Sequence, residues 1–71
     1  LVNVSDEDGM TPLHHAALNN YAQCAEVLLE AGAEWNATNH AGQTPLDLAT
    51  QHQNAKTLAV LRRYGSVEKA P

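Results

Sequence analysis

The chain lacks phenylalanine and contains a single cysteine, one tryptophan and two tyrosines. One thiol, Cys24, cannot form a disulfide within the chain, which favours a reducing compartment such as the cytosol or nucleus. The shortage of aromatic residues argues against a thick core and favours close packing of helices through small side chains. No apolar run approaches the about 18–20 residues of a membrane span, so we expect no membrane insertion.

Basic residues are few and unevenly placed. The net charge is −4, and residues 1–36 contain six acidic residues but no Lys or Arg. A nucleic-acid surface needs clustered basic residues, so we expect no nucleic-acid partner. The acidic half is either an ordinary solvated surface or a face that steers a basic partner. The length of 71 residues fits one small domain, and the missing initiator Met indicates a piece cut from a longer protein.

The sequence repeats itself with a fixed offset. Thr11-Pro12-Leu13 recurs 33 residues later as Thr44-Pro45-Leu46. A period of this length is typical of stacked repeats, which expose a long surface and have no single closed pocket. The same offset pairs further identical residues, namely Asn3/Asn36, Gly9/Gly42, Ala16/Ala49, Ala22/Ala55, Val27/Val60, Leu28/Leu61, Gly32/Gly65 and Ala37/Ala70.

Each repeat predicts a turn followed by two helices. In the first repeat, residues 6–9 form the turn, Thr11 is the N-cap and Pro12 is the first helical residue. The helix runs to about Leu18, where residues 19–20 end it because Asn tolerates left-handed geometry. The second helix runs from residue 21 or 22 to 31 and ends at Gly32; its apolar face consists of Cys24, Val27, Leu28 and Ala31.

The second repeat follows the same plan. Residues 39–42 form the turn, Thr44 is the N-cap, and the Asp47 carboxylate can accept from the N–H of that cap. A break at residues 51–54 precedes a helix over 55–64, which is expected to end at Gly65 and leave a frayed tail. The inner face of this helix is predicted to contain Thr57, Val60, Leu61 and Tyr64.

Two segments carry a family resemblance, namely Asp6-x-x-Gly9-x-Thr11-Pro12-Leu13-His14-x-Ala16-Ala17 and Val27-Leu28-Leu29-x-x-Gly32-Ala33-x-x-Asn36-Ala37. Together they resemble an ankyrin repeat, and residues 39–49 resemble the start of a second one. The resemblance implies an all-α ankyrin-repeat solenoid of stacked antiparallel helix pairs with β-hairpin-type finger loops. It also implies a module that binds proteins on the concave surface formed by finger tips and first helices.

The resemblance divides the chain into the end of a preceding repeat (1–5), one ankyrin repeat (6–38), a C-terminal capping repeat (39–66) and a tail (67–71). Thr50 and Arg62-Arg63 place polar residues on the outer face of the second repeat, as a terminal repeat requires. The first repeat has no such cap. We therefore expect its apolar face to lie open to further repeats, to another protein or to self-association.

The family's variable contact positions give a candidate partner-binding set. The alternative is that these residues are merely exposed. They are Glu7, Asp8 and Met10 on the first finger, His40, Ala41 and Gln43 on the second, Thr38 between the fingers, and Leu18, Asn19, Gln51 and His52 at the ends of the first helices.

The histidines and the cysteine give little support for a metal site or an enzyme. Adjacent side chains on a helix diverge by about 100°, so His14 and His15 cannot share one metal, and we expect no cofactor. The resemblance makes His14 a capping partner of Thr11, and we expect His15 to be partly buried between helices. Cys24 is expected to be a buried, inert thiol, with no cleft to hold a catalytic pair.

Two neighbouring residues of the first repeat leave alternatives open. Trp35 either packs under the next finger or anchors a partner. Asn36 either ties one finger to the next, as the resemblance implies, or is hydroxylated, because Leu28, Glu34 and Asn36 resemble the pattern around modified asparagines in some ankyrin repeats.

Taken together, the sequence predicts an intracellular, cytoplasmic or nuclear, non-catalytic module for protein–protein interaction. The alternative is a purely structural cap of a larger ankyrin array, with the binding site elsewhere in the parent protein.

Overall fold

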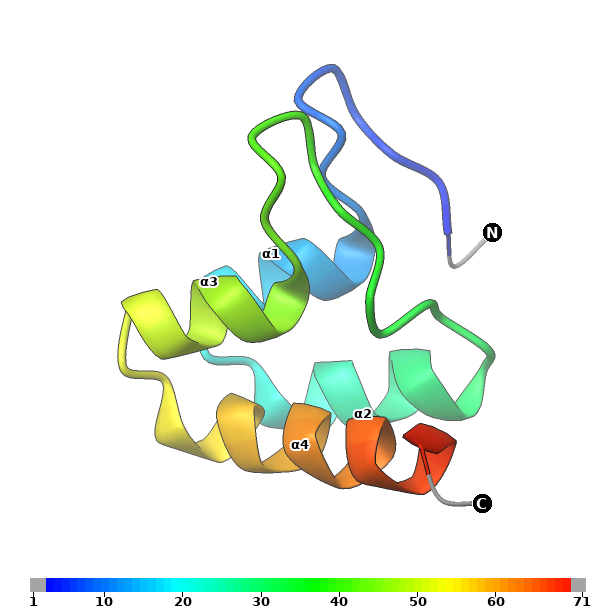
Figure 1. Ribbon diagram of the computed structural model, residues 1–71, viewed down its shortest axis with the longest axis vertical. Coiled ribbons are helices and arrows are strands. Elements are labelled where there is room, and N and C mark those ends of the chain that lie inside the picture. The colour runs from blue at the N-terminus through cyan, green and yellow to red at the C-terminus, as the bar shows by residue number, and fades with distance from the viewer. Residues whose placement is uncertain (1–2, 70–71) are drawn as a thin grey trace.

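The chain folds into two stacked helix pairs, each preceded by a projecting loop (Figure 1). The structure is a computed structural model that describes residues 3–69, with side chains through Tyr64. The four helices are α1 (Pro12–Leu18), α2 (Ala22–Glu30), α3 (Pro45–Gln51) and α4 (Ala55–Lys69). No strand forms between residues 3 and 69.

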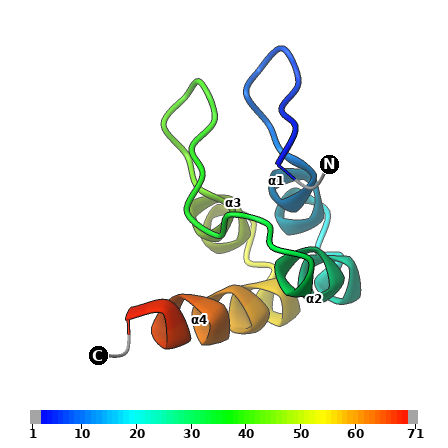
Figure 2. The same ribbon diagram turned by 90° about the vertical axis from the view of Figure 1, so that its right-hand side faces the viewer.

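The helices lie in two layers, and the finger loops rise from one of them (Figure 2). Helix α1 packs beside α3 in the layer that carries the fingers, and α2 packs beside α4 in the other. The core between the layers consists of small and branched apolar side chains: Leu13, Ala16, Ala17, Ala25, Leu29, Ala33, Leu48, Ala49 and Leu61. The expected stacking of antiparallel helix pairs through small residues is confirmed.

Both first helices begin with the capping arrangement that the sequence predicts. Thr11 Oγ1 accepts from the N–H of His14 at 3.3 Å, and His14 Nδ1 accepts from the N–H of Thr11 at 3.1 Å. In α3 the corresponding pair is Thr44 and Asp47, with both bonds at 3.1 Å. Each box satisfies two backbone donors that the helix itself leaves free, which stabilises a helix by about 1 kcal/mol.

The turns between the helices of each pair bind the two repeats together. Asn20 takes the left-handed conformation (φ 60°), and its Oδ1 accepts from the Thr57 hydroxyl at 3.0 Å. Asn54 Nδ2 donates to the carbonyl oxygens of Ala17 at 2.6 Å and Leu18 at 3.1 Å, at the end of α1. The predicted break at residues 19–20 is confirmed, and the one predicted at 51–54 begins one residue later, because Gln51 is the last residue of α3. Polar side chains in these breaks therefore satisfy the backbone at the ends of the neighbouring repeat's helices.

The predicted end of the last helix is wrong, because α4 continues through Gly65 to Lys69. Gly32 ends the first repeat with φ 99°, in a turn where the N–H of Ala33 donates to the carbonyl oxygen of Leu28. A glycine inside a helix costs only about 1 kcal/mol, so without such a turn it does not stop the helix. Of the expected tail, residues 67–69 are helical and 70–71 lie outside the described residues, as do residues 1–2 of the preceding-repeat segment.

Two burial predictions in the first repeat are wrong, because both Cys24 and His15 are exposed. The residues one repeat later, Thr57 and Leu48, are buried where the second helix pair packs on the first. Among the described residues, nothing packs on the same side of the first pair. An exposed apolar face of the first pair, which includes Tyr21 and Val27, accounts for both errors.

Candidate protein-binding surface

Each finger is a tight loop built around one polar side chain. In the first, Asp6 Oδ1 accepts from the N–H groups of Asp8 and Met10, both at 2.9 Å. In the second, Asn39 Oδ1 accepts from the N–H groups of Ala41 and Gln43, also at 2.9 Å. Asp and Asn suit this place because their short side chains reach the backbone two residues ahead. The predicted turns are confirmed.

The two fingers are held together at their tips. The N–H of His40 donates to the carbonyl oxygen of Asp8 at 2.9 Å. Gly9, with φ 77°, lies so close that a Cβ there would stand 2.9 Å from the backbone nitrogen of His40. A larger residue at this position would push the second finger away, so the glycine sets the separation of the tips.

Two histidines connect α1 to the fingers. The buried His14 places Nε2 2.9 Å from the carbonyl oxygen of Gln43, at the base of the second finger. His15 Nε2 lies 3.1 Å from Asp6 Oδ2 in the first. The N–H of Met10 is the largest cause that lowers the pKa of Asp6, and the hydrogen bond from His15 adds to it. Because its two ring nitrogens bond to Thr11 and to Gln43, His14 is both the predicted capping partner and a link between the two repeats.

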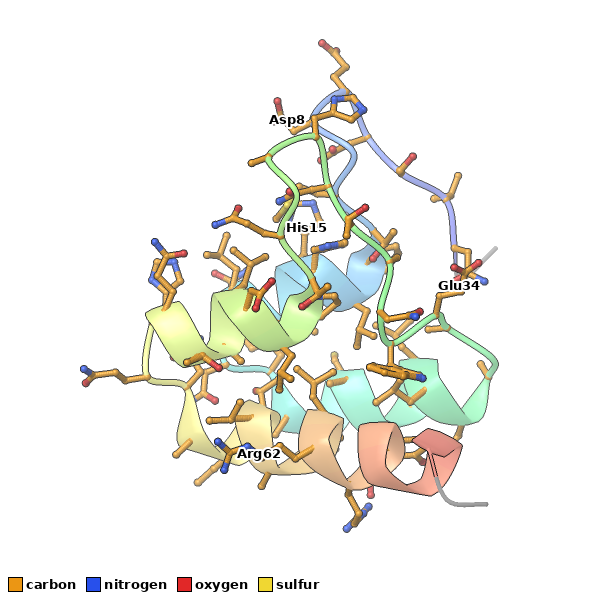
Figure 3. The ribbon with its side chains drawn as sticks, viewed as in Figure 1. Asp8, His15, Glu34 and Arg62 are labelled. Atoms are coloured by element: carbon orange, nitrogen blue, oxygen red, sulfur yellow. The ribbon has the colours of Figure 1, made fainter. Side chains whose placement is uncertain are left out.

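The two fingers and α1 border an open groove of about 600 Å³, which we call the finger groove. Figure 3 shows Asp8 at the finger tips, with His15 nearer to α1. The groove contains no Lys or Arg and mixes carboxylates with apolar groups. It is lined by Asp6, Asp8, Met10, His15, Leu18, Asn39, His40, Ala41 and Gln43.

Six of the predicted contact residues line the finger groove, namely Asp8, Met10, Leu18, His40, Ala41 and Gln43. Met10 is half-buried rather than fully exposed, since its sulfur accepts from Asn39 Nδ2 at 3.2 Å and its side chain packs against the core.

The other predicted contacts lie around the groove or away from it. Glu7 is exposed on the first finger, and His52 is exposed at the end of α3. Gln51 accepts from Gln43 Nε2 at 3.1 Å, which places it against the groove lining. Asn19 Nδ2 donates to the carbonyl oxygen of His15, so it caps its own helix. Thr38 lines a separate hollow of about 220 Å³ with Asn3, Ser5, Gly9, Thr11, Glu34, Ala37 and His40.

Sequence reasoning missed three residues of the groove lining, Asp6, His15 and Asn39. The sequence predicts Asp6 and Asn39 only as turn residues, although a side chain that organises a loop also contributes to the wall of a groove beside it. It predicts His15 between helices. The spacing of His15 indicates its place in the groove, because it lies three residues before the predicted contact Leu18 and so shares a face of the same helix.

The pair Trp35 and Asn36 follows α2. Trp35 is half-buried against the core and lines a hollow with Leu29 of α2 and Tyr64 of α4, so the packing seen here is on the second helices. Asn36 is exposed. Asn3, which stands 33 residues before Asn36, makes a tie of this kind, because its Oδ1 accepts from the N–H of Glu34 at 2.8 Å.

Between residues 3 and 64 no three His, Cys, Asp or Glu side chains gather as a metal site would require. None of the described helices combines the length and the apolar character needed to cross a bilayer. The groups that line the finger groove can form hydrogen bonds, ion pairs and apolar contacts with a partner.

The chain is similar to known ankyrin-repeat proteins in sequence and in structure. The family model described as "Ankyrin repeats (many copies)" matches residues 1–49. Human fem-1 homolog C is 46% identical over 57 residues, which is 80% of this chain and 9% of that protein. Human inversin is 39% identical over 71 residues, which is 97% of this chain and 7% of that protein.

The same similarity holds for a solved structure. The human ASB11 ankyrin repeat domain superposes with a TM-score of 0.86 at 35% identity, covering 92% of this chain and 29% of that one. The chain thus spans less than a tenth of the curated relatives named above and under a third of the solved domain.

Proposed function

Because the chain belongs to the ankyrin-repeat family, we propose that it is a non-catalytic module that binds a protein partner through the finger groove. Ankyrin repeats are in general protein-interaction modules, and their helical solenoid serves as a binding scaffold. We choose the finger groove as the binding surface because this one hollow contains six residues at the family's variable contact positions.

The chemistry of the groove favours a partner segment with both basic and apolar side chains. Asp8 presents a carboxylate, and no Lys or Arg lies among the lining residues to neutralise it. The carboxylate of Asp6 adds negative charge nearby, although its oxygens already bond to the finger backbone and to His15. Met10 and Leu18 add apolar surface, and a thioether adapts its shape to what it contacts. The negative charge of the groove speeds the encounter with a basic partner, and the apolar contacts then slow the release of that partner.

The rigidity of the fingers supports the same proposal. The hydrogen bond between His40 and Asp8, together with the tight contact at Gly9, holds both tips in one arrangement before any partner arrives. Binding a partner therefore costs less conformational entropy than it would if the finger loops became ordered only on binding. We place the module in the cytosol or nucleus, where its single thiol stays reduced. The competing proposal is a structural cap whose parent protein binds elsewhere.

A pull-down with two matched variants tests the proposal. The groove variant combines Asp8→Lys with Met10→Ala. The control combines Glu30→Lys with Val4→Ala, the same kinds of change at exposed positions outside the groove. We expect the groove variant to lose its partners and the control to keep them, with circular dichroism confirming that both are folded. Partners retained by the folded groove variant would favour the structural cap.

A photo-reactive amino acid at position 41 would then map the contact directly. Ala41 is exposed and lies in the groove lining, so its replacement disturbs little. We expect cross-linked peptides to be rich in Lys or Arg beside an apolar residue. Acidic cross-linked peptides would contradict the partner chemistry argued from the carboxylates.

A further inference from the structure

The finger groove contains two histidines among its lining residues. His15 and His40 both border the groove, and both are exposed. Histidine is the side chain whose charge ordinarily changes between about pH 5 and 8. The other charged groups of the lining are the carboxylates of Asp6 and Asp8, and carboxylic acids of ordinary strength are ionised throughout this range. The groove therefore holds two groups that make it negative and two that can cancel this charge.

His15 faces the one oxygen of Asp6 that the finger backbone does not use. Asp6 Oδ1 accepts from the N–H groups of Asp8 and Met10, whereas Oδ2 lies 3.1 Å from His15 Nε2. Neither side chain is enclosed, since His15 is 51% and Asp6 is 46% exposed. The imidazole can therefore exchange its second proton with solvent while Nε2 donates to the carboxylate in both charge states.

The proton on His15 decides how much of the charge of Asp6 a partner meets. A neutral imidazole donates a hydrogen bond and leaves the carboxylate negative. A protonated imidazole forms an ion pair with the carboxylate, which then attracts a basic group of a partner less strongly. Asp6 stays ionised through this change, because its pKa lies below 3.8, mainly through the hydrogen bond from the N–H of Met10.

His40 places a second imidazole at the finger tips. Its N–H donates to the carbonyl oxygen of Asp8 at 2.9 Å, and its ring lies so close to Gly9 that a Cβ there would stand 2.8 Å from Cδ2. These contacts hold the ring at the tips, where Figure 3 shows Asp8. A protonated His40 would therefore repel a basic partner at the same place where Asp8 attracts it.

The elements around the two imidazoles add one carboxylate and no Lys or Arg among the residues that line the neighbouring hollows. His15 also borders an apolar hollow on α1 and α2 with Tyr21 and Cys24, and phenols and thiols ionise only in more alkaline solution. His40 also borders the separate hollow that contains Glu34. A carboxylate outside the groove does not reverse the direction of the change within it.

We propose that the finger groove releases a basic partner as the pH falls from about 7.5 to about 5.5, because His15 and His40 become positive beside its two carboxylates. The inference rests on the proposed binding role of the groove. The apolar contacts of the groove do not titrate, so the affinity falls but is not abolished. We expect the dissociation constant to rise about five- to tenfold at low salt, and the rise to shrink as salt screens the exposed charges.

The probe for the test is a short rhodamine-labelled peptide of alternating Lys and Leu with blocked ends, which does not titrate in this range. Fluorescence polarisation at about pH 7.5 and about pH 5.5 gives its dissociation constant. The amide signals of Asp8 and Ala41 in NMR spectra show whether the peptide lies in the groove. We expect the natural chain to bind the peptide about five- to tenfold more weakly at the lower pH.

The decisive variant combines His15→Gln with His40→Gln, because glutamine keeps a hydrogen-bonding side chain that cannot become positive. Its dissociation constant should change by less than about twofold between the two pH values, and each single variant should lie between it and the natural chain. The matched control is His52→Gln, at an exposed position outside the groove lining, which should keep the full pH response. Circular dichroism at both pH values confirms that each chain is folded.

The outcomes separate this inference from the proposed function. The buried His14 remains in every variant, so a loss of affinity caused by its protonation would persist in the double variant. Equal affinity of the natural chain at both pH values, or equal weakening in the double variant, would overturn the inference and leave the proposed function standing. A peptide that binds at neither pH, or outside the groove, would contradict the proposed basic and apolar partner, and the inference with it.

Discussion

His14 donates from Nε2 to the carbonyl oxygen of Gln43, 2.9 Å away, and so joins the first helix to the second finger. Because Nδ1 accepts from the N–H of Thr11, Nε2 must carry the proton. One buried imidazole thus satisfies a backbone donor in its own repeat and a backbone acceptor in the next. The bond between His14 and Gln43 explains how a small core holds the second finger in place.

Replacing His14 by Ala should destabilise the protein by about 2–4 kcal/mol, since it removes buried volume, leaves the N–H of Thr11 without its acceptor and removes one of the two hydrogen bonds to the Gln43 carbonyl oxygen. Urea unfolding followed by circular dichroism measures the loss. The control is His52→Ala, at an exposed position, which should change stability by less than about 0.5 kcal/mol. Equal effects of the two changes would refute the linking role of His14.

Thr57 and Asn20 should be energetically coupled across the two repeats. The Thr57 hydroxyl donates to Asn20 Oδ1 at 3.0 Å, and Thr57 is fully buried. A double-mutant cycle with Thr57→Val and Asn20→Ala should give a coupling free energy of about 1 kcal/mol. The same cycle between Thr57→Val and the distant Asn39→Ala should be additive. Absence of coupling in the first cycle would mean that the hydrogen bond does not stabilise the stack.

Gly9→Ala and Gly42→Ala form a matched pair, because both glycines have φ 77°. At either position, alanine held at positive φ lowers the stability of the protein by about 1 kcal/mol. Only at Gly9 would the added Cβ meet His40, whereas at Gly42 nothing lies within 4 Å. We therefore expect Gly9→Ala to lose more stability and to weaken partner binding as the tips separate. Identical stability and affinity in the two variants would contradict the tip contact.

Acid should weaken the first finger through Asp6. Its pKa lies below the ordinary value of 3.8, mainly because the N–H of Met10 donates to the carboxylate. A carboxyl with a lowered pKa contributes stability above its ordinary pKa and loses it as the pH falls through the lowered value. Below pH 3.8 the unfolding midpoint should therefore fall less in Asp6→Asn than in the natural chain. Glu30→Gln serves as the control, and parallel pH profiles for all three chains would rule out the contribution of Asp6.

Hydroxylation of Asn36 remains a prediction. The side chain is exposed, so a modifying enzyme could reach it. Mass spectrometry of the protein from cells that contain an asparagine hydroxylase should show a peptide heavier by one oxygen, and Asn36→Ala should abolish the shift. An unmodified peptide from such cells would show that Asn36 is not a hydroxylation site.

The local part of the fold could be predicted because it depends on neighbouring residues. Thr11 and Thr44 specify their caps through side chains three residues away, and Gly9 specifies its turn through a missing Cβ. Errors arose where the local signal was weak. Gly65 looked like a terminator, but glycine ends a helix only when the following residues close a turn, and α4 continues past it.

The sequence by itself determined the repeat, the helix pairs, the capping boxes and the finger turns, because these follow from spacing and from the backbone preferences of single residues. Only the tertiary structure decided which apolar face is covered. Cys24 and Thr57 occupy the same place in their repeats, yet one is exposed and the other buried, because burial depends on what packs against a helix. It also decided that Met10 is half-buried and that Asp6 and His15 join the groove, since a hollow between loops and helices exists only once the two repeats are stacked.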